Sequence, residues 1–456
     1  MSDIISNPQA IVKKLTEFSE INQLSDKDKD NLVDLLIFLQ KHIENNNDDM
    51  EDDFLGTINM LFIKIFVNID DYDVLIILSI LLSNTSAILD DNYMNDFCEQ
   101  SFIDKLIITL GIQDEKLQYY LGYLFTNLIQ INDFFKMISV EYWIRLACRT
   151  IYPFVFAEII LAISVSPEVE LPLTEIPELI QKALVCAINQ EDDFVVIPST
   201  KAISNLIFYY IEIKNTIVLN QIMMIIKPMF DDIYNLIRNQ SFSSGVFSMI
   251  SAIIQLDFSF RFNYEKDFCA VPENNNRLLF VSDKMYKEIY SILSNSQNYS
   301  FDYLENLLNL ISDIGEKYLE IPNLIINKLL DLCTNSPFTF KCHVVILISI
   351  IIHNMNFQDN YGLKFFQLLI ELIIVPAFDI IDELLESFSY MLEMNNGEFC
   401  DYLLNFSNCL FEDFQNALEE IQENSQNEKT SDLVDEIKYI IKKQSPRSYE
   451  MIYSDG

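Results

Sequence analysis

The sequence is rich in carboxylates but poor in histidine, and its potential nucleophiles, bases and metal ligands do not have the spacing of a known site. The 456 residues include three histidines, His42, His343 and His353. His343 follows Cys342, but adjacent residues on a helix face different directions, which argues against a base and nucleophile pair. His343 and His353 lie ten residues apart, which is not the i, i+4 spacing of two ligands on a helix. Walker, GxSxG and HExxH motifs are missing, so we expect no enzyme activity, no cofactor and no metal site.

The eight cysteines likewise lack the spacing of a zinc or redox site. The closest two are nine residues apart, so there is no CxxC motif. Disulfide frameworks belong to small secreted domains, and this chain is neither small nor led by a signal peptide. We therefore expect reduced, mostly buried thiols in a protein of the cytoplasm and nucleus.

The elements that position these side chains are predicted to be helices. The chain has only 8 glycines and 12 prolines, whereas average usage of the two is roughly 12%. Such scarcity argues against turn-rich β folds and against glycine-lined phosphate sites. Leu304, Leu307, Leu308, Ile311 and Ile314 recur with the period of one helix face.

The charge and hydrophobic content of the sequence indicate which kinds of partner the protein can bind. There are 68 Asp and Glu against 30 Lys and Arg, a net charge of -38, so a groove for nucleic acid is not expected. A hydrophobic content of 50% predicts a folded chain rather than a disordered one. The apolar runs Val74–Leu82 and Val344–Ile352 have about half of the ~20 residues that a membrane helix needs, so no membrane partner is expected either.

One segment, LQYYLGYLFTNLIQ at Leu117–Gln130, resembles the third helix of an armadillo repeat in the importin alpha family. Tyr123 stands where that family has its groove tryptophan, and Asn127 stands on its groove asparagine. Lys201–Leu206 (KAISNL) and Phe247–Ser251 (FSMIS) are similar to the same pattern. Leu418–Lys443 resembles the closing repeat.

Candidates for the groove-asparagine position recur along the chain. They are separated by 36 to 47 residues, except for one step of 62 that contains a predicted irregular insertion at Leu256–Ser282. Armadillo and related repeats have periods of about 40–47 residues. The candidates are Ile80, Asn127, Ser164, Asn205, Ser251, Asp313, Ser349 and Tyr390. The resemblance thus implies an all-α, armadillo/HEAT-like right-handed superhelical solenoid of about eight repeats.

The resemblance also implies a peptide-binding groove at Asn127, Tyr123, Asn205 and Phe247. In the family, the asparagines hold the backbone of an extended peptide, and the aromatic rings carry the stems of its basic residues. An amide has both a donor and an acceptor, and an aromatic face attracts a cation. Lys201 stands where the family has a groove tryptophan, and it would repel a lysine of the peptide. Only part of the family's set of groove residues is therefore present.

The N-terminal region departs from the family. Residues 1–50 contain five lysines, no arginine and ten acidic residues, whereas importin alpha has an arginine-rich arm that binds importin beta. We therefore expect residues 1–60 to be a helical, acidic segment with Leu32–Ile43 as a helix, and coupling to an importin-beta-like partner to be doubtful. Residues 61–445 would form the solenoid and 446–456 a tail.

Two functions fit these observations. The first is an importin-alpha-like adaptor that binds an extended basic peptide, resembling a nuclear localisation signal, in nuclear protein import. The alternative is a divergent armadillo/HEAT scaffold that binds other proteins without recognising such signals. The missing tryptophans favour the scaffold, and the two asparagines favour the adaptor.

Overall fold

The computed structural model describes residues 8–21, 23–45, 52–88, 95–112, 114–129, 139, 143–144, 147–148, 150, 152–165, 175–263, 280–318, 321–354, 360–376, 378–394, 398–404, 408–425 and 427–444. Within these ranges the regular elements are helices, which confirms the predicted all-α class. The chain divides into two compact units, Met1–Met229 and Phe230–Gly456, and each is described by itself.

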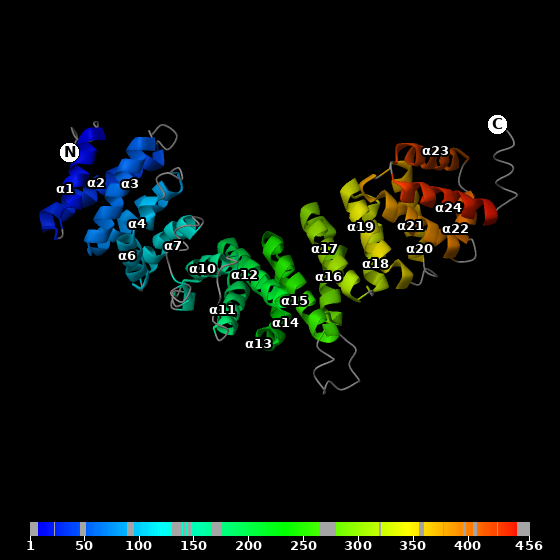
Figure 1. Ribbon diagram of the computed structural model, residues 1–456, viewed down its shortest axis with the longest axis horizontal. Coiled ribbons are helices and arrows are strands. Elements are labelled where there is room, and N and C mark those ends of the chain that lie inside the picture. Colours follow the sequence, from blue (N-terminus) through cyan, green and yellow to red (C-terminus); the bar gives the residue numbers. More distant parts are fainter. Residues whose placement is uncertain are drawn as a thin grey trace. The chain divides into compact units, whose positions relative to one another are not determined.

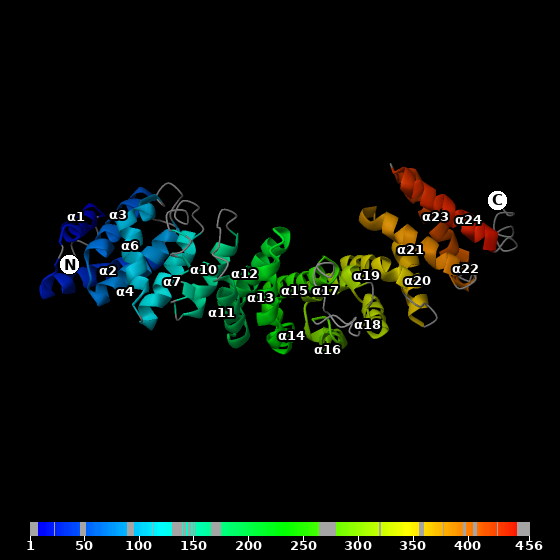
Figure 2. The ribbon, with the colours of Figure 1, turned by 60° about the horizontal axis from the view of Figure 1, so that its bottom comes forward.

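The first unit is a stack of helices that follow one another along the chain (Figures 1 and 2). They are α1 Pro8–Ser19, α2 Asp26–Asn45, α3 Asp52–Asn68, α4 Tyr72–Ser86, α6 Gln100–Leu110, α7 Glu115–Ile129, α10 Pro153–Val165, α11 Ile176–Asn189, α12 Asp193–Glu212 and α13 Thr216–Ile226. Contacts between them define two layers. The back layer contains α1, α3, α6, α11 and α13, and the front layer contains α2, α4, α7, α10 and α12.

The second unit repeats this arrangement. Its helices are α14 Phe230–Leu236, α15 Ser243–Asn263, α16 Asp283–Ser294, α17 Phe301–Tyr318, α18 Asn323–Cys333, α19 Phe338–Ile351, α20 Asn360–Ile374, α21 Ile381–Glu393, α22 Glu398–Leu404, α23 Asn408–Asn424 and α24 Glu428–Gln444. Here the front layer is α15, α17, α19, α21 and α24, each in contact with the next, and α14, α16, α18, α20 and α23 form the back layer.

The eight predicted repeat positions fall on consecutive front-layer helices. Ile80 is on α4, Asn127 on α7, Ser164 on α10 and Asn205 on α12, and the other four lie one each on α15, α17, α19 and α21. Within each unit, the repeat period read from the sequence is therefore the period of the front layer. Each helix of the layer needs a neighbour on both sides to cover its apolar surface, which is the packing logic of a solenoid.

Acidic residues begin several front-layer helices. The Asp71 carboxylate accepts hydrogen bonds from the backbone amides of Asp73 and Val74 at the start of α4. Asp114 accepts one from Leu117 at 2.8 Å at the start of α7, and Asp192 accepts one from Phe194 at the start of α12. These carboxylates satisfy free amides at the end where the helix dipole is positive. Part of the acidic excess thus has a structural use at one edge of the front layer.

Two helical stretches, Asp193–Glu212 and Gln240–Ser259, are long and apolar enough by composition to cross a membrane. In each, 61% of the stretch is buried inside the molecule. Helix α12, which forms the first stretch, packs against α10 and α11. Burial by neighbouring helices on more than one side accounts for this apolar composition.

The first part of the irregular insertion predicted at Leu256–Ser282 is helical, which corrects that prediction. Helix α15 continues through Asn263, so residues 256–263 are helical. Leu256 is fully buried and Lys317 of α17 lies over the Phe258 ring at 5.4 Å, contacts that a sequence pattern with weak periodicity does not reveal. Residues 264–279 lie outside the described part of the chain.

The N-terminal segment is also part of the array. Leu32–Ile43 is helical as predicted, within α2, but α2 packs on α4 as a front-layer helix and α1 packs on α3. The predicted boundary at residue 60 falls inside α3. The predicted C-terminal tail, 446–456, is outside the described residues.

Helices α7 and α10 approach closely at Gly122. A Cβ atom added to this glycine would lie 2.9 Å from Cγ2 of Val155 and 3.1 Å from Cδ1 of Phe154. The missing side chain therefore lets α10 pack directly on α7. The next residue of α7, Tyr123, places its ring 5.0 Å from the Phe154 ring, centroid to centroid.

Gly122→Ala is expected to lower the free energy of unfolding by up to about 2 kcal/mol. Alanine in a helix interior is favoured over glycine by about 1 kcal/mol, but overpacking a buried contact costs about 1–3 kcal/mol. Urea unfolding of Gly122→Ala, Val155→Ala and the double variant measures this. Val155→Ala removes the clashing methyl group, so the double variant should be less destabilised than the sum of the two. A Gly122→Ala protein more stable than wild type would show that the contact relaxes without cost.

Candidate functional site

Asn127 joins two neighbouring helices of the front layer. Its amide nitrogen donates to the Ser83 carbonyl oxygen at 3.1 Å and to the Ser86 hydroxyl at 2.9 Å, both on α4. The Ser86 hydroxyl in turn donates to the Ser83 carbonyl at 2.9 Å. Both N–H bonds of the amide are thereby used, and the carbonyl oxygen of Asn127 is left as the group that can bind a peptide.

The same kind of contact recurs at other repeat positions. Asn205 on α12 donates from its amide to the Ser164 hydroxyl on α10 at 3.1 Å. In the second unit, the Ser251 hydroxyl donates to the Asp313 carboxylate at 2.5 Å. The last pair spans the step of 62 residues, so the register predicted across the insertion is confirmed by a direct bond. These polar pairs join α4 to α7, α10 to α12 and α15 to α17.

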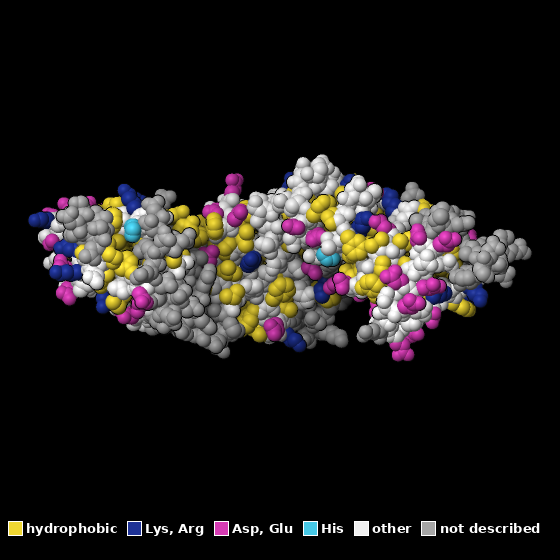
Figure 3. Space-filling model, turned by 90° about the horizontal axis from the view of Figure 1, so that it is seen from above, with side chains coloured by type: hydrophobic (Ala, Val, Ile, Leu, Met, Phe, Trp, Pro, Cys, Tyr) yellow, Lys and Arg dark blue, Asp and Glu magenta, His cyan; other side chains and the backbone are white. Residues whose placement is uncertain are grey.

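Four aromatic side chains form a continuous strip across α7, α10 and α12. We name Tyr119, Tyr123, Phe154 and Phe194 the aromatic strip. The ring centroids are 5.0 Å apart for Tyr119 and Tyr123, 5.0 Å for Tyr123 and Phe154, and 6.4 Å for Phe154 and Phe194. Tyr119 is 51% exposed and Phe194 is 60% exposed. In Figure 3, hydrophobic side chains gather over this part of the first unit, with acidic side chains near them.

Phe247 and Trp143 do not contribute exposed rings. Phe247 is only 7% exposed, because its ring packs against Tyr303 of α17 with a centroid distance of 5.4 Å. Trp143 is fully buried against Phe125, with centroids 4.9 Å apart. Lys201 is exposed on α12, as expected for a residue that stands where the resembling family has an aromatic side chain in its groove. The peptide-binding roles of Asn127, Tyr123, Asn205 and Phe247 stay predictions, and Phe247 offers a partner little surface.

Two carboxylates, Glu158 and Asp192, lie near the aromatic strip. Glu158 lies one turn beyond Phe154 on α10, on the same face, and it is half-buried. Burial raises the pKa of Glu158 to about 7. The hydrogen bond shared with Tyr119, burial and the Asp192 carboxylate raise the pKa of Tyr123 to about 12, so this ring is neutral at physiological pH. Neutral rings beside carboxylates form a surface that attracts cations.

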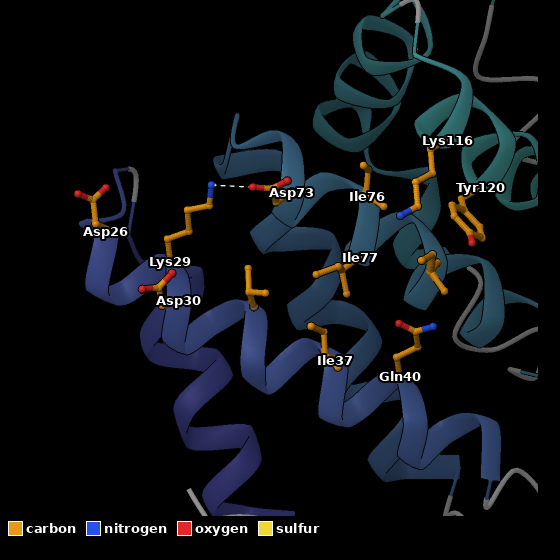
Figure 4. Close-up of a pocket in the computed structure, with 12 residues that line it drawn as sticks. Asp26, Lys29, Asp30, Ile37, Gln40, Asp73, Ile76, Ile77, Lys116 and Tyr120 are labelled. Carbon is orange, nitrogen blue, oxygen red and sulfur yellow. Dashed lines mark hydrogen bonds and ion pairs between the residues drawn. The ribbon is translucent and has the colours of Figure 1, made fainter.

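A groove borders the aromatic strip on the same layer. Its volume is about 780 Å³, and residues of α2, α4 and α7 line it (Figure 4). Its floor is aliphatic, and charged side chains stand at its ends. Tyr120 on the groove wall meets Tyr119 of the strip edge-on, with ring centroids 5.3 Å apart. We name this feature the apolar groove.

Sequence reasoning found part of this surface. It identified Tyr123 from one motif but missed Phe154 and Phe194, which occupy other helices in segments with no such motif. The sequence did hold one signal for them. Each phenylalanine is the second residue of its front-layer helix, so the two occupy the same place in successive repeats. The apolar groove was missed altogether, because its residues come from three helices that are separated by more than 30 positions in the sequence.

Comparison with known proteins supports the fold. No family model matches the chain, and no curated protein matches it in sequence. The crystal structure of an engineered protein is similar with a TM-score of 0.59 and 12% identity, covering 96% of this chain and 98% of that chain. A structure of Kap95p with RanGDP gives 0.49 at 11% identity, covering 97% and 64%, and one of importin beta gives 0.39 at 11%, covering 96% and 62%.

Identities this low bear on the fold alone. The chain is an all-α helical solenoid of the armadillo/HEAT kind. The predicted resemblance is confirmed at this level, and a specific relationship to importin alpha is not.

Asn127→Ala is expected to lower the free energy of unfolding by about 1–2 kcal/mol, because the buried Ser86 hydroxyl loses its donor and the Ser83 carbonyl keeps only the bond from Ser86. Urea unfolding measures this loss. Asn220→Ala, an exposed asparagine on α13, is the matched control and should cost nothing. Equal stability of the two variants would contradict the structural role of the Asn127 amide.

Glu158→Gln is expected to stabilise the protein above pH 7 by about 1–3 kcal/mol, a benefit that shrinks as the pH falls toward 4.5. The folded pKa is raised, so the folded state binds the proton more tightly than the unfolded state, and ionising Glu158 costs stability at high pH. Unfolding midpoints at pH 5 and pH 8 test this. A benefit of equal size at both values would show that Glu158 ionises normally.

Proposed function

We propose that this protein is an interaction scaffold whose first unit binds an extended, basic segment of a partner protein across the front layer. The observation that carries the proposal is the aromatic strip, a run of exposed and half-exposed rings that crosses three consecutive helices. Solenoids present such continuous surfaces, and an extended chain can contact each helix in turn.

The chemistry of the strip selects for cations. A lysine or arginine over an aromatic ring contributes about 0.5–2 kcal/mol, and Glu158 and Asp192 add attraction nearby. Basic residues of this chain are few, and several are engaged in ion pairs such as Lys284 with Asp231 at 2.8 Å and Lys429 with Glu386 at 2.8 Å. The net charge of -38 therefore steers a basic partner toward the molecule.

The finer form of the proposal is an import adaptor that recognises signals of this basic type and works without enzyme activity in the cytoplasm and nucleus. It is supported by the asparagines and Tyr123 in their motif positions. The scaffold without signal recognition is favoured by a different observation. The Asn127 and Asn205 amides already bind neighbouring helices, and Phe247 is buried.

Tyr119→Ala/Phe194→Ala is expected to weaken binding of a labelled peptide rich in lysine and arginine by about thirtyfold, because each of the two rings contributes about 1 kcal/mol to the binding of a cation. Fluorescence anisotropy with the full-length protein measures this at low and high salt. Binding to wild type should weaken as salt rises, because exposed charges are screened.

Met224→Ala is the control, since Met224 is 76% exposed on back-layer helix α13. It should leave the affinity unchanged. Unaltered binding in the double aromatic variant would remove the strip from the site. A dissociation constant that does not change with salt would argue for an apolar partner surface.

A further inference from the structure

The apolar groove has an aliphatic floor that other parts of the first unit leave partly uncovered. Val33 and Ile37 of α2 form one side, and Ile76, Ile77 and Ile80 of α4 form the other (Figure 4). Ile37 is 37% exposed, and Val33, Ile77 and Ile80 are half-buried. Covering a leucine-sized side chain on such a floor contributes about 1.5–3 kcal/mol.

The two ends of the groove differ in charge. Asp26, Asp30 and Asp73 stand at one end, around Lys29. The Lys29 ammonium is already held by Asp71 and Asp73, each at 2.9 Å, so it neutralises only part of this cluster. At the other end Lys116 projects from α7 beside Tyr120 (Figure 4). A cation is therefore attracted to the first end and repelled at the second.

The groove and the aromatic strip form one path. Tyr120 lines the groove and touches Tyr119, the first residue of the strip. The groove is centred on α4, and the middle of the strip is on α10, two helices further along the front layer. Neighbouring helices lie about 8–10 Å apart, so these centres are separated by about 16–20 Å. An extended chain covers about 3.3 Å per residue, which makes this distance about five or six residues.

We propose that the apolar groove binds a leucine, isoleucine or valine side chain of the same partner segment that places its basic residues on the aromatic strip. The aliphatic anchor lies five or six residues from the basic residues. The residues between them, which pass Lys116, are uncharged or acidic. A further lysine or arginine on the outer side of the anchor meets Asp26, Asp30 and Asp73. This assignment rests on the proposed function and adds a sequence pattern to it.

The test uses three labelled peptides and the full-length protein in fluorescence anisotropy. The first carries a leucine five residues before a lysine and arginine cluster, the second has serine in place of that leucine, and the third has the leucine without the cluster. The leucine is expected to tighten binding about tenfold relative to serine. The third peptide should bind far more weakly than the first.

Val33→Ser/Ile37→Ser is expected to abolish the tenfold advantage of leucine while leaving the affinity for the serine peptide unchanged. Ile108→Ser is the matched control, because Ile108 is 67% exposed on back-layer helix α6. The Ile108→Ser protein should still bind the leucine peptide about tenfold more tightly than the serine peptide. Circular dichroism and unfolding midpoints establish that both variants fold.

The outcomes separate the two proposals. If the serine and leucine peptides bind equally well to wild type, and binding depends on the aromatic strip, the anchor is wrong and the proposed function stands. If no basic peptide binds, the proposed function itself fails. If the third peptide, which has the leucine without the basic cluster, binds as well as the first, the link between the apolar groove and the aromatic strip is wrong. A change of oligomeric state in Val33→Ser/Ile37→Ser, seen by light scattering, would show instead that the groove holds a second copy of this chain.

Discussion

The contact between consecutive front-layer helices is the interaction on which the rest of this structure depends. No helix pair can bury its apolar surfaces alone, so each needs the next pair. Apolar packing sets the spacing of the helices, but it allows sliding along their axes. The polar pairs, Asn127 with Ser83 and Ser86, Asn205 with Ser164, and Ser251 with Asp313, oppose such sliding because a shifted helix would leave buried donors unmatched. The aromatic strip and the apolar groove exist only in that register.

This role changes the meaning of the two asparagines. An amide can hold a partner's backbone or a neighbouring helix, and here its N–H groups point to the neighbouring helix. Loss of peptide binding in a variant lacking both asparagines would therefore mix two effects, a weaker array and a missing ligand group. The aromatic rings are the cleaner probe, since Tyr119 and Phe194 are exposed and their removal leaves the polar pairs between helices in place.

The sequence was sufficient to predict the helices and their repeat, because both follow from local periodicity. The periodic residues of α17 are buried as the pattern indicated, namely Leu304, Leu307, Leu308, Ile311 and Ile314. The positions found by motif fall on successive front-layer helices of each unit. The sequence did not predict which side chains contact one another between repeats. The partners of Asn127 on α4 are Ser83 and Ser86, three and six positions beyond the predicted Ile80. Phe247 matched a groove motif yet is covered by Tyr303, which lies far along the chain. Side chains that meet across 40 residues or more carry no local signal.

The hydrogen bond between Ser251 and Asp313 has a consequence for how this chain can change over time. It joins two helices on either side of the longest connection between repeat positions, so helix register there does not depend on the length of what lies between. A module grafted between α15 and α16 would therefore leave the Ser251–Asp313 bond, and with it the register of α15 against α17, in place.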